Sequence, residues 1–187
     1  MGRTREAALS GALVAIAKYG SRKATMGDIA MMAGIAKVTL YNHFRTRDDV
    51  YAAVVVAEID AIAAAVAQST GGFDLAVVAA ATALGDNPAV RRVARDEPAV
   101  LATLATPGEG PGWSAARGHI ASALAAAGCQ SSPAAVDLVL RYLTTQLLSP
   151  SGAVERAAVG QLIAAAISVH PDQLVESALA GNAGTSN

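Results

Sequence analysis

The sequence predicts an all-α protein in which an N-terminal three-helix helix-turn-helix domain precedes a larger helical domain, with about nine helices in all. Three observations predict this class. Apolar residues recur at three-to-four spacing along most of the chain, Gly and Pro clusters separate these segments, and no stretch alternates apolar and polar residues as a strand does. We place the first domain at residues 1–46, the second at 47–180 and a disordered tail at 181–187.

The first helix is expected from about Thr4 to Tyr19, with an apolar face that includes Leu9 and Ile16. Gly20 ends it, because Gly enters left-handed backbone space without strain. The preceding Arg3 and Arg5 either reach a polyanion or belong to a disordered start.

The second helix begins at Thr25, which together with Asp28 resembles a capping box. Ile29 and Met32 then repeat at helical spacing, and Gly34 is the stop signal.

The third helix is predicted over Lys37–His43, with Leu40 and Phe44 facing inward. The residues left on its other faces include Lys37, Val38, Tyr41 and Asn42. Asn pairs bidentately with adenine, Lys reaches guanine and Val touches a thymine methyl, so this face suits a major groove. The alternative is a small helical hairpin with a solvated polar face.

The remaining helices follow from the same signals. We expect them at 47–67, 73–84, 98–104, 113–127, 133–148 and 153–169, and we expect a further short helix that begins at residue 88. Residues 106–112, rich in Gly and Pro, are expected to be a loop, either a mobile segment beside a pocket or a poorly ordered connection.

Composition limits the classes of protein. Although 53% of the residues are hydrophobic, much of this is Ala, and we expect no apolar run to approach the roughly eighteen residues of a membrane-spanning helix. No signal peptide is evident, and the single Cys129 fits a reducing cytoplasm, as an inert thiol. We therefore expect a cytoplasmic protein that does not contact a membrane.

Charge is unevenly distributed along the chain. Residues 1–50 carry eight Lys or Arg against four Asp or Glu, a net charge of +4, whereas residues 51–187 carry six against eleven, a net charge of −5. A basic N-terminal segment followed by an acidic remainder is typical of a protein that binds nucleic acid through one end.

The N-terminal motif resembles the DNA-binding domain of the TetR family of bacterial transcriptional regulators. The matching positions are Thr25, Ile29-Ala30, Ala33-Gly34, Thr39-Leu40-Tyr41, His43-Phe44 and Arg47. The resemblance implies a homodimer that reads a palindromic operator in double-stranded DNA, and a C-terminal ligand-binding and dimerisation domain whose small-molecule effector weakens DNA binding.

The same resemblance implies the DNA contacts. Lys37, Val38 and Asn42 would read bases, Thr39, Tyr41 and His43 would contact bases and phosphates, and Arg47 would contact a backbone phosphate; Thr25 completes the set of DNA-binding candidates. One departure is Ala36, at a position where the family usually has a Ser or Thr cap, which is worth about 1 kcal/mol.

The helices expected at 133–148 and 153–169 are apolar on more than one face and therefore must be buried on several sides. We expect them to form the dimer interface through Val136, Leu140, Leu143, Leu147, Val159, Leu162, Ile163 and Ala166. The alternative is that the pair packs only on its own subunit.

The effector pocket is implied by the resemblance alone. Its candidate residues are Asp60, Phe73, Trp113, His119, Tyr142, Thr145 and Gln146, of which Asp60 is a possible partner for a cation. Abundant Ala either leaves room for an apolar ligand or packs tightly with little cavity. Asp60 and His119 are alternatively ordinary surface or core polar residues.

Catalysis is not indicated. The sequence has no metal-ligand spacing, no nucleophile motif and no Gly-rich phosphate loop, so we expect no enzyme, no metal and no cofactor. The leading function is a ligand-responsive transcriptional repressor. The alternative is a helical ligand- or partner-binding module that no longer binds DNA.

Overall fold

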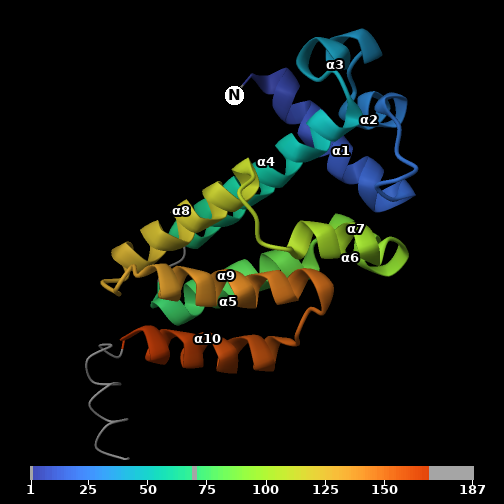
Figure 1. Cartoon of the computed structure of the whole chain (residues 1–187). Coiled ribbons are helices and arrows are strands. Elements are labelled where there is room, and N and C mark those ends of the chain that lie inside the picture. The colour runs from blue at the N-terminus through green and yellow to red at the C-terminus, as the bar shows by residue number, and fades with distance from the viewer. Residues whose placement is uncertain (1, 69–70, 169–187) are drawn as a thin grey trace, which may run out of the picture.

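The computed structural model describes residues 2–68 and 71–168 of the 187-residue chain. This part folds into ten α-helices without a strand, as the all-α class predicts (Figure 1). The helices are α1 (Arg3–Tyr19), α2 (Met26–Ala33), α3 (Lys37–His43), α4 (Arg47–Gln68), α5 (Phe73–Asp86), α6 (Pro88–Asp96), α7 (Pro98–Ala105), α8 (Pro111–Ala126), α9 (Pro133–Leu148) and α10 (Ala153–Ser168). The expected tail at 181–187 and the end of the last expected helix at Val169 lie outside the described residues.

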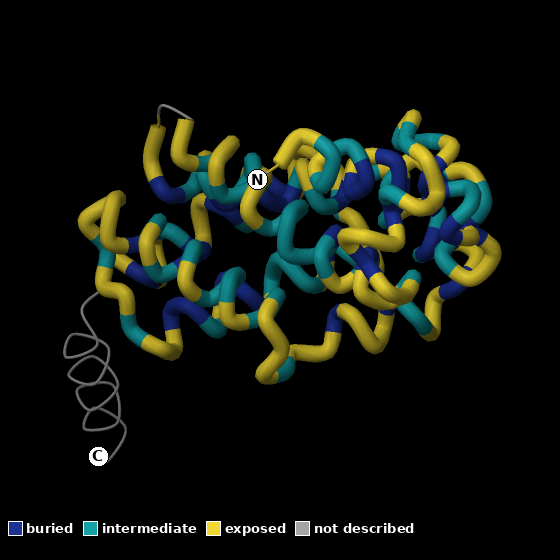
Figure 2. Tube along the Cα trace, turned by 90° about the horizontal axis from the view of Figure 1, so that it is seen from above, coloured by how far each residue is buried: buried dark blue, intermediate teal, exposed yellow. Residues whose placement is uncertain are grey.

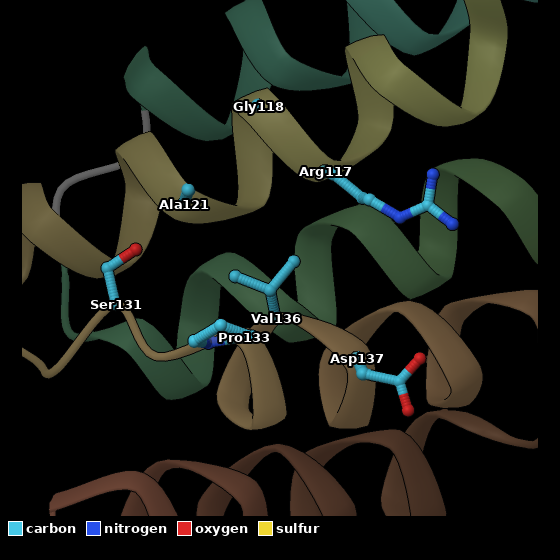
Figure 3. Close-up of a pocket in the computed structure, with 7 residues that line it drawn as sticks. All are labelled: Arg117, Gly118, Ala121, Ser131, Pro133, Val136 and Asp137. Carbon is cyan, nitrogen blue, oxygen red and sulfur yellow. The ribbon is translucent and has the colours of Figure 1, made fainter. Parts of the chain in front are cut away.

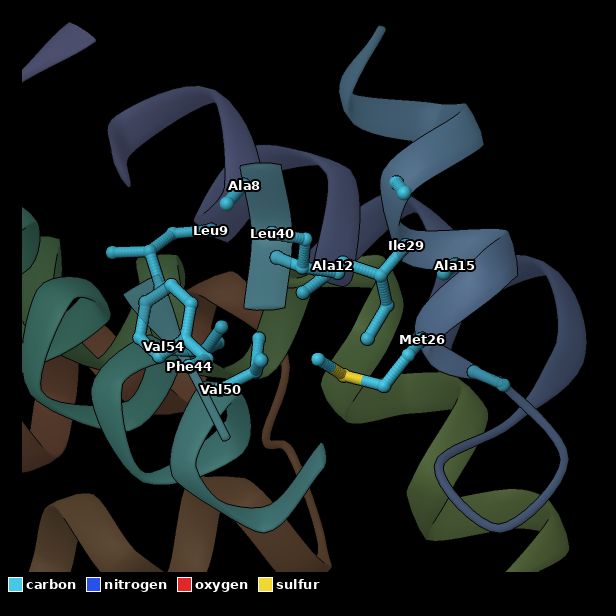
Figure 4. Close-up of a cluster of buried hydrophobic side chains, with 12 residues drawn as sticks. Ala8, Leu9, Ala12, Ala15, Met26, Ile29, Leu40, Phe44, Val50 and Val54 are labelled. Atoms are coloured by element: carbon cyan, nitrogen blue, oxygen red, sulfur yellow. The ribbon is translucent and has the colours of Figure 1, made fainter. Parts of the chain in front are cut away.

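Helices α1, α2 and α3 pack around one hydrophobic core, to which the start of α4 also contributes (Figure 4). Ile29 and Leu40 are fully buried, and Phe44 lies against the α4 side chains Val50 and Val54. The inward positions predicted for α2 and α3 are therefore confirmed. Because α4 completes this core, the orientation of the N-terminal domain is tied to the position of α4.

Two glycines define the geometry of this domain. At Gly11 an added Cβ would stand 2.6 Å from the backbone nitrogen of Ala33, so only Gly allows α1 and α2 to approach this closely. Gly34 has a φ of +65° and ends α2 in the left-handed conformation, as predicted. Arg3 and Arg5, expected before the first helix, lie in the first turn of α1 instead.

The second domain is built around one helix pair, α4 with α8, and one group of three helices, α5 with α9 and α10. The long helix α4 runs beside α8, while α5 packs against both α9 and α10 (Figure 1). Its core includes Val77, Leu124 and Val139, which are at most 2% exposed. At Gly160 of α10 an added Cβ would stand 2.9 Å from the carbonyl oxygen of Asp74, so this small residue brings α10 close to α5.

A third buried cluster joins the two domains. It contains Ile16 from α1, Ala89 and Val93 from α6, and Leu101 from α7. Figure 2 shows buried and exposed segments alternating along the helices, as expected when each helix covers a core with one face. The division at residue 46 remains a prediction, but α6 and α7 clearly connect the second domain to α1.

The predicted loop at 106–112 is wrong at its end. Helix α8 begins at Pro111, so Pro111 and Gly112 form its first turn. Pro is well suited to a first helical position because its missing N–H would be unpaired there anyway. Gly112 lies so close to α4 that an added Cβ would stand 3.1 Å from a methyl carbon of Val55. Tertiary packing therefore favours a helix where composition favours a loop.

Helix α4 corrects the expectation about membrane-spanning length. By length and composition alone it is apolar enough to cross a membrane, and it is the one such helix in residues 2–68 and 71–168. In the fold, α4 contacts α1, α5 and α8. Val50 and Val54 are buried in the N-terminal core, whereas other apolar residues of α4, among them Val55, Ile59 and Ile62, line a cavity of the second domain.

The predicted dimer residues on α9 and α10 divide into three groups. Val136, Leu140 and Ile163 are at most 9% exposed within their own chain, so their assignment to a subunit surface is wrong. Leu143, Leu147 and Val159 are half-buried. Leu162 and Ala166 are exposed. The physical reason is that a helix apolar on several faces satisfies its first contacts with α5 and α8 of the same chain.

Candidate nucleic-acid interface and effector cavity

The start of α2 is held by the predicted capping box. The backbone N–H of Thr25 donates to Asp28 Oδ2 at 2.9 Å, and the backbone N–H of Asp28 donates to the Thr25 hydroxyl oxygen at 3.2 Å. The Thr25 hydroxyl also donates to Asp28 Oδ2. These bonds to Thr25 lower the pKa of the Asp28 carboxyl below its ordinary value. Thr25 thus has a structural role, and a contact with DNA is a further role that stays a prediction.

Helix α3 presents the side chains expected of a recognition helix. Leu40 is fully buried and anchors it, whereas Val38 is 67% and Tyr41 45% exposed. Lys37, Asn42 and His43 are also exposed, and Thr39 is half-buried. The Lys37 ammonium lies 5.9 Å from the centre of the Tyr41 ring, so a cation and an aromatic ring share one surface.

The first turn of α3 has no side-chain cap, as predicted from Ala36. The backbone at Ala36 is extended, with φ −66° and ψ 144°, which is the conformation of an N-cap residue. Only the hydroxyl that would accept a hydrogen bond from the next turn is missing.

Arg47 has contacts within the chain in this structure. Its Nη1 donates to the carbonyl oxygen of Arg22 at 2.9 Å and to that of Ala24 at 3.4 Å. Its guanidinium also lies 5.5 Å from the centre of the Tyr51 ring. Arg47 therefore connects α4 to the turn between α1 and α2. A phosphate contact by the remaining guanidinium nitrogens stays a prediction.

The same turn is held from the second domain by Glu97, between α6 and α7. Its carboxylate accepts hydrogen bonds from the Ser21 hydroxyl at 2.6 Å and from the backbone N–H of Arg22 at 3.1 and 3.2 Å. Tyr51 donates to the Ser21 carbonyl oxygen at 2.8 Å. At Gly20, φ is +85° and an added Cβ would stand 2.6 Å from Glu97 Oε1, so Gly is required here.

Sequence reasoning missed Glu97. A Glu before Pro98 has the pattern of an ordinary helix start, and its partners lie 75 and 76 positions away. We call the contact of Glu97 with Ser21 and Arg22 the interdomain clamp.

A cavity of about 870 Å³ lies in the second domain, lined mainly by α4, α5, α8 and α9. It extends to Leu13 and Ile16 of α1 and to Val93 of α6, next to the junction cluster. Such a volume is within the range of small-molecule sites. The Ala-rich helices could either leave room for a ligand or pack tightly with little cavity. The cavity supports the first alternative.

Only some of the predicted pocket residues line this cavity in the structure. Phe73, Trp113 and His119 line the cavity. Asp60 adjoins it, because its Oδ1 lies 2.8 Å from His119 Nε2 in a half-exposed pair.

Three predicted pocket residues are wrong, because Tyr142, Thr145 and Gln146 do not line the cavity. Gln146 is buried, and its Oε1 accepts from the backbone and hydroxyl of Ser151, which fixes the turn after α9. The Thr145 hydroxyl donates to the Tyr142 carbonyl oxygen, and the Tyr142 ring packs in the second-domain core. These side chains lie on the faces of α9 that turn away from the cavity.

Glu58 of α4 is a cavity residue that sequence reasoning missed. Its Oε2 accepts a hydrogen bond of 2.8 Å from Asn87 Nδ2, and both residues line the cavity. Burial raises the pKa of the Glu58 carboxyl, and the bond from Asn87 opposes that rise. A carboxylate within the apolar stretch of α4 was the available signal, but Asp60 two positions later carries the same signal.

A second, shallower pocket of about 480 Å³ lies between α8 and α9 (Figure 3). Arg117 and Asp137 are its charged residues, and each is bonded elsewhere: Arg117 to the Gly108 carbonyl oxygen and Asp137 to Arg141. Within the described residues, no group of three or more His, Cys, Asp and Glu side chains could hold a metal ion.

Comparison with known proteins agrees with this geometry. Residues 8–54, which contain α2, α3 and most of α1, match the family model described as bacterial regulatory proteins, tetR family. No curated protein matches the chain.

Solved structures of regulators share the fold. The repressor AlkX from Dietzia sp., implicated in the biodegradation of n-alkanes, has a TM-score of 0.66 at 20% identity, over 87% of this chain and 94% of that one. FadR of Bacillus halodurans, a fatty acid degradation regulator, has a TM-score of 0.63 at 17% identity, over 88% and 96%. The repressor QsdR of R. erythropolis has a TM-score of 0.56 at 17% identity, over 90% and 97%.

Proposed function

We propose that the chain is a TetR-family transcriptional regulator, a repressor that binds a palindromic operator as a homodimer and is released by a small, largely apolar effector. The observation that carries this proposal is the apolar cavity that reaches the junction between the DNA-binding domain and α6. A ligand there contacts the same helices that hold the recognition helix in position.

The DNA contacts are assigned to the exposed face of α3. Lys37, Val38 and Asn42 are proposed to read base edges, because they carry the chemistry for guanine, a thymine methyl and adenine. Thr39, Tyr41 and His43 would share contacts with bases and phosphates. The net charge of +4 on residues 1–50 supports attraction to the phosphate backbone.

The homodimer is proposed to form through the outer faces of α9 and α10. Exposed apolar side chains there are Leu138, Leu148, Val154 and Leu162. Because Val154, Leu162 and the exposed Ala158 and Ala166 follow helical spacing, they form one stripe along α10. A two-fold dimer would place the two α3 helices in successive major grooves, about 34–36 Å apart.

Effector release is proposed to use two connections to the α1–α2 turn. One runs through α4, whose residues line the cavity and whose first turns carry Arg47 and Tyr51. The other runs through α6 and the interdomain clamp at Glu97. An effector releases DNA only if it binds more tightly to the arrangement in which the two recognition helices no longer match the half-sites. A regulator of this kind acts on chromosomal DNA in the bacterial cytoplasm.

The first experiment is selection of binding sites from a random duplex pool with the purified full-length protein at two salt concentrations. We expect an enriched palindrome whose affinity falls steeply as salt rises. Lys37→Ala and Tyr41→Ala should each weaken binding to that palindrome by about tenfold or more.

The matched control is Arg95→Ala, which removes an exposed cation of the second domain paired with Asp96. It should leave operator affinity unchanged. If no sequence is enriched, or if Lys37→Ala and Tyr41→Ala bind as well as the wild type, the helical binding module without DNA affinity becomes the better description.

A further inference from the structure

The cavity is apolar apart from a few polar side chains, and most of these already have partners. The Ser122 hydroxyl donates to the Gly118 carbonyl oxygen at 2.9 Å, and the Thr144 hydroxyl donates to that of Arg141 at 2.8 Å. His119 is paired with Asp60. The two hydroxyl protons are thus used within the chain, so these hydroxyl groups can only accept from a ligand, and they carry no charge.

Glu58 differs from them. Asn87 donates to its Oε2, while the Asn87 Oδ1 accepts from the backbone N–H groups of Ala89 and Val90 and caps α6. Asn87 is therefore fixed at both ends and holds the carboxylate in one orientation. Within residues 2–68 and 71–168, Glu58 Oε1 accepts no hydrogen bond, so it is a charged acceptor that is available to a ligand.

The charged residues that line the cavity also single out Glu58. Among the described residues that line the cavity there is no Lys or Arg, and Glu58 is the one carboxylate. The nearby Arg117 lines the separate α8–α9 pocket and donates to the Gly108 carbonyl oxygen. An anionic ligand would thus lie close to a negative charge without a guanidinium or ammonium to pair with, which is costly in an apolar cavity.

We propose that the effector of this cavity is an amphipathic cation, an apolar body with one basic nitrogen whose N–H donates to the Glu58 carboxylate. The inference rests on the proposed function only in placing the effector in this cavity. Burial raises the pKa of the Glu58 carboxyl, and a cation bound beside it would lower that pKa again, because an opposite charge favours the carboxylate.

The test compares three ligands with the same apolar chain: decylamine, decanol and decanoic acid, each kept below the concentration at which it aggregates. The only Trp of the chain, Trp113, lines the cavity, so its fluorescence reports binding directly. We expect decylamine to bind about tenfold more tightly than decanol, and decanoic acid to bind most weakly, because a charge-assisted hydrogen bond exceeds a neutral one.

Two variants localise the effect. Glu58→Gln keeps the shape and an acceptor for Asn87 but removes the charge, so it should abolish the preference for the amine and leave decanol affinity unchanged. The matched control is Asp60→Asn, which removes the neighbouring carboxylate of α4 and should retain the preference. The inference is overturned if decanoic acid binds wild type as tightly as decylamine, or if Glu58→Gln keeps the preference, or if Asp60→Asn alone removes it.

A separate readout distinguishes this inference from the proposed function. Each ligand is added to the complex with the selected palindrome. If decylamine binds through Glu58 but leaves operator affinity unchanged, the assignment of the cavity stands and ligand-responsive release fails. If decanol releases the operator and no amine preference exists, release stands and the cation assignment is overturned.

Discussion

The Ser21 hydroxyl donates a 2.6 Å hydrogen bond to the carboxylate of Glu97, 76 positions later in the chain. Ser21 belongs to the turn that precedes the helix-turn-helix, and Glu97 lies between two helices of the second domain. Glu97 is 9% exposed, so this polar contact is largely shielded from water. It joins the turn after α1 to the segment between α6 and α7, two helices whose Val93 and Leu101 line the cavity.

The first prediction concerns this clamp. Hydrogen bonds to charged groups contribute about 1.5–3 kcal/mol, so a double-mutant cycle of Ser21→Ala and Glu97→Ala should give a coupling free energy of that order. The measurement is the free energy of unfolding in denaturant for the four proteins. Ser10→Ala is the control, because Ser10 is exposed on α1 and should change stability little. A coupling near zero would show that the clamp has no energetic role.

The second prediction concerns the uncapped start of α3. Ala36 already has N-cap backbone angles, so Ala36→Ser should supply the missing acceptor and raise the free energy of unfolding by about 1 kcal/mol. Thr25→Ala, which removes the existing cap of α2, should lower it by about the same amount. Amide hydrogen exchange in the first turn of α3 checks the location, since protection there should rise only in Ala36→Ser. Unchanged protection and stability would contradict the assignment.

The third prediction concerns acid stability. Hydrogen bonding to the buried Arg156 lowers the pKa of the Asp86 carboxyl below its ordinary value of 3.8, and Arg91 contributes to the same shift. A carboxyl whose pKa is lower in the folded state stabilises the fold above the ordinary value, and this stabilisation is lost as the pH falls through the lowered value. Protonation would also leave Arg156, which is 5% exposed, without its counter-charge.

Asp86→Asn should therefore reduce stability at neutral pH and flatten the loss of stability that the wild type shows below about pH 4. Urea unfolding at a series of pH values measures both effects. The control is Asp137→Asn, in the exposed pair with Arg141, which should retain most of the acid-dependent loss. If Asp86→Asn loses stability on acidification as steeply as the wild type, Asp86 is not responsible.

The fourth prediction concerns the dimer. Leu162 is 68% exposed on α10, so Leu162→Glu should leave the fold of one chain intact while placing a charge in the proposed interface. Sedimentation of the wild type should show a dimer, and that of Leu162→Glu a monomer with reduced operator affinity. Leu75→Glu, at a 50% exposed position of α5, is the matched control and should remain dimeric. A monomeric wild type, or a dimeric Leu162→Glu, would place the interface elsewhere.

Helix boundaries set by local contacts were predictable. The Thr25–Asp28 box forms as expected, and Asn87 and Ser132 cap α6 and α9 at the predicted starts of these helices. Each joins groups within three positions of one another, so the pattern of residue types is sufficient to predict it. Helix α8 is the exception, because the Gly-rich composition of residues 106–112 favours a loop although Pro111 suits a first helical position.

The buried faces of the second domain were not predictable in the same way. In a helix that is apolar on several sides, the sequence does not specify which side meets its own chain. Val136, Leu140 and Ile163 thus pack inside the subunit, although they are aliphatic residues like the exposed Leu138 and Leu162. Only the positions of α5 and α8 distinguish the two sets.

The sequence by itself determined the helix-turn-helix, the exposed chemistry of α3 and the missing cap at Ala36, because these depend on contacts within a few residues. Only the tertiary structure decided that Glu97 bonds Ser21, that Glu58 is held by Asn87 in the cavity, and that Gln146 lies outside it. Such contacts join side chains 29 or more positions apart, or depend on which helix face is covered. They arise when the helices pack to bury apolar surface, and a local sequence pattern does not specify that packing.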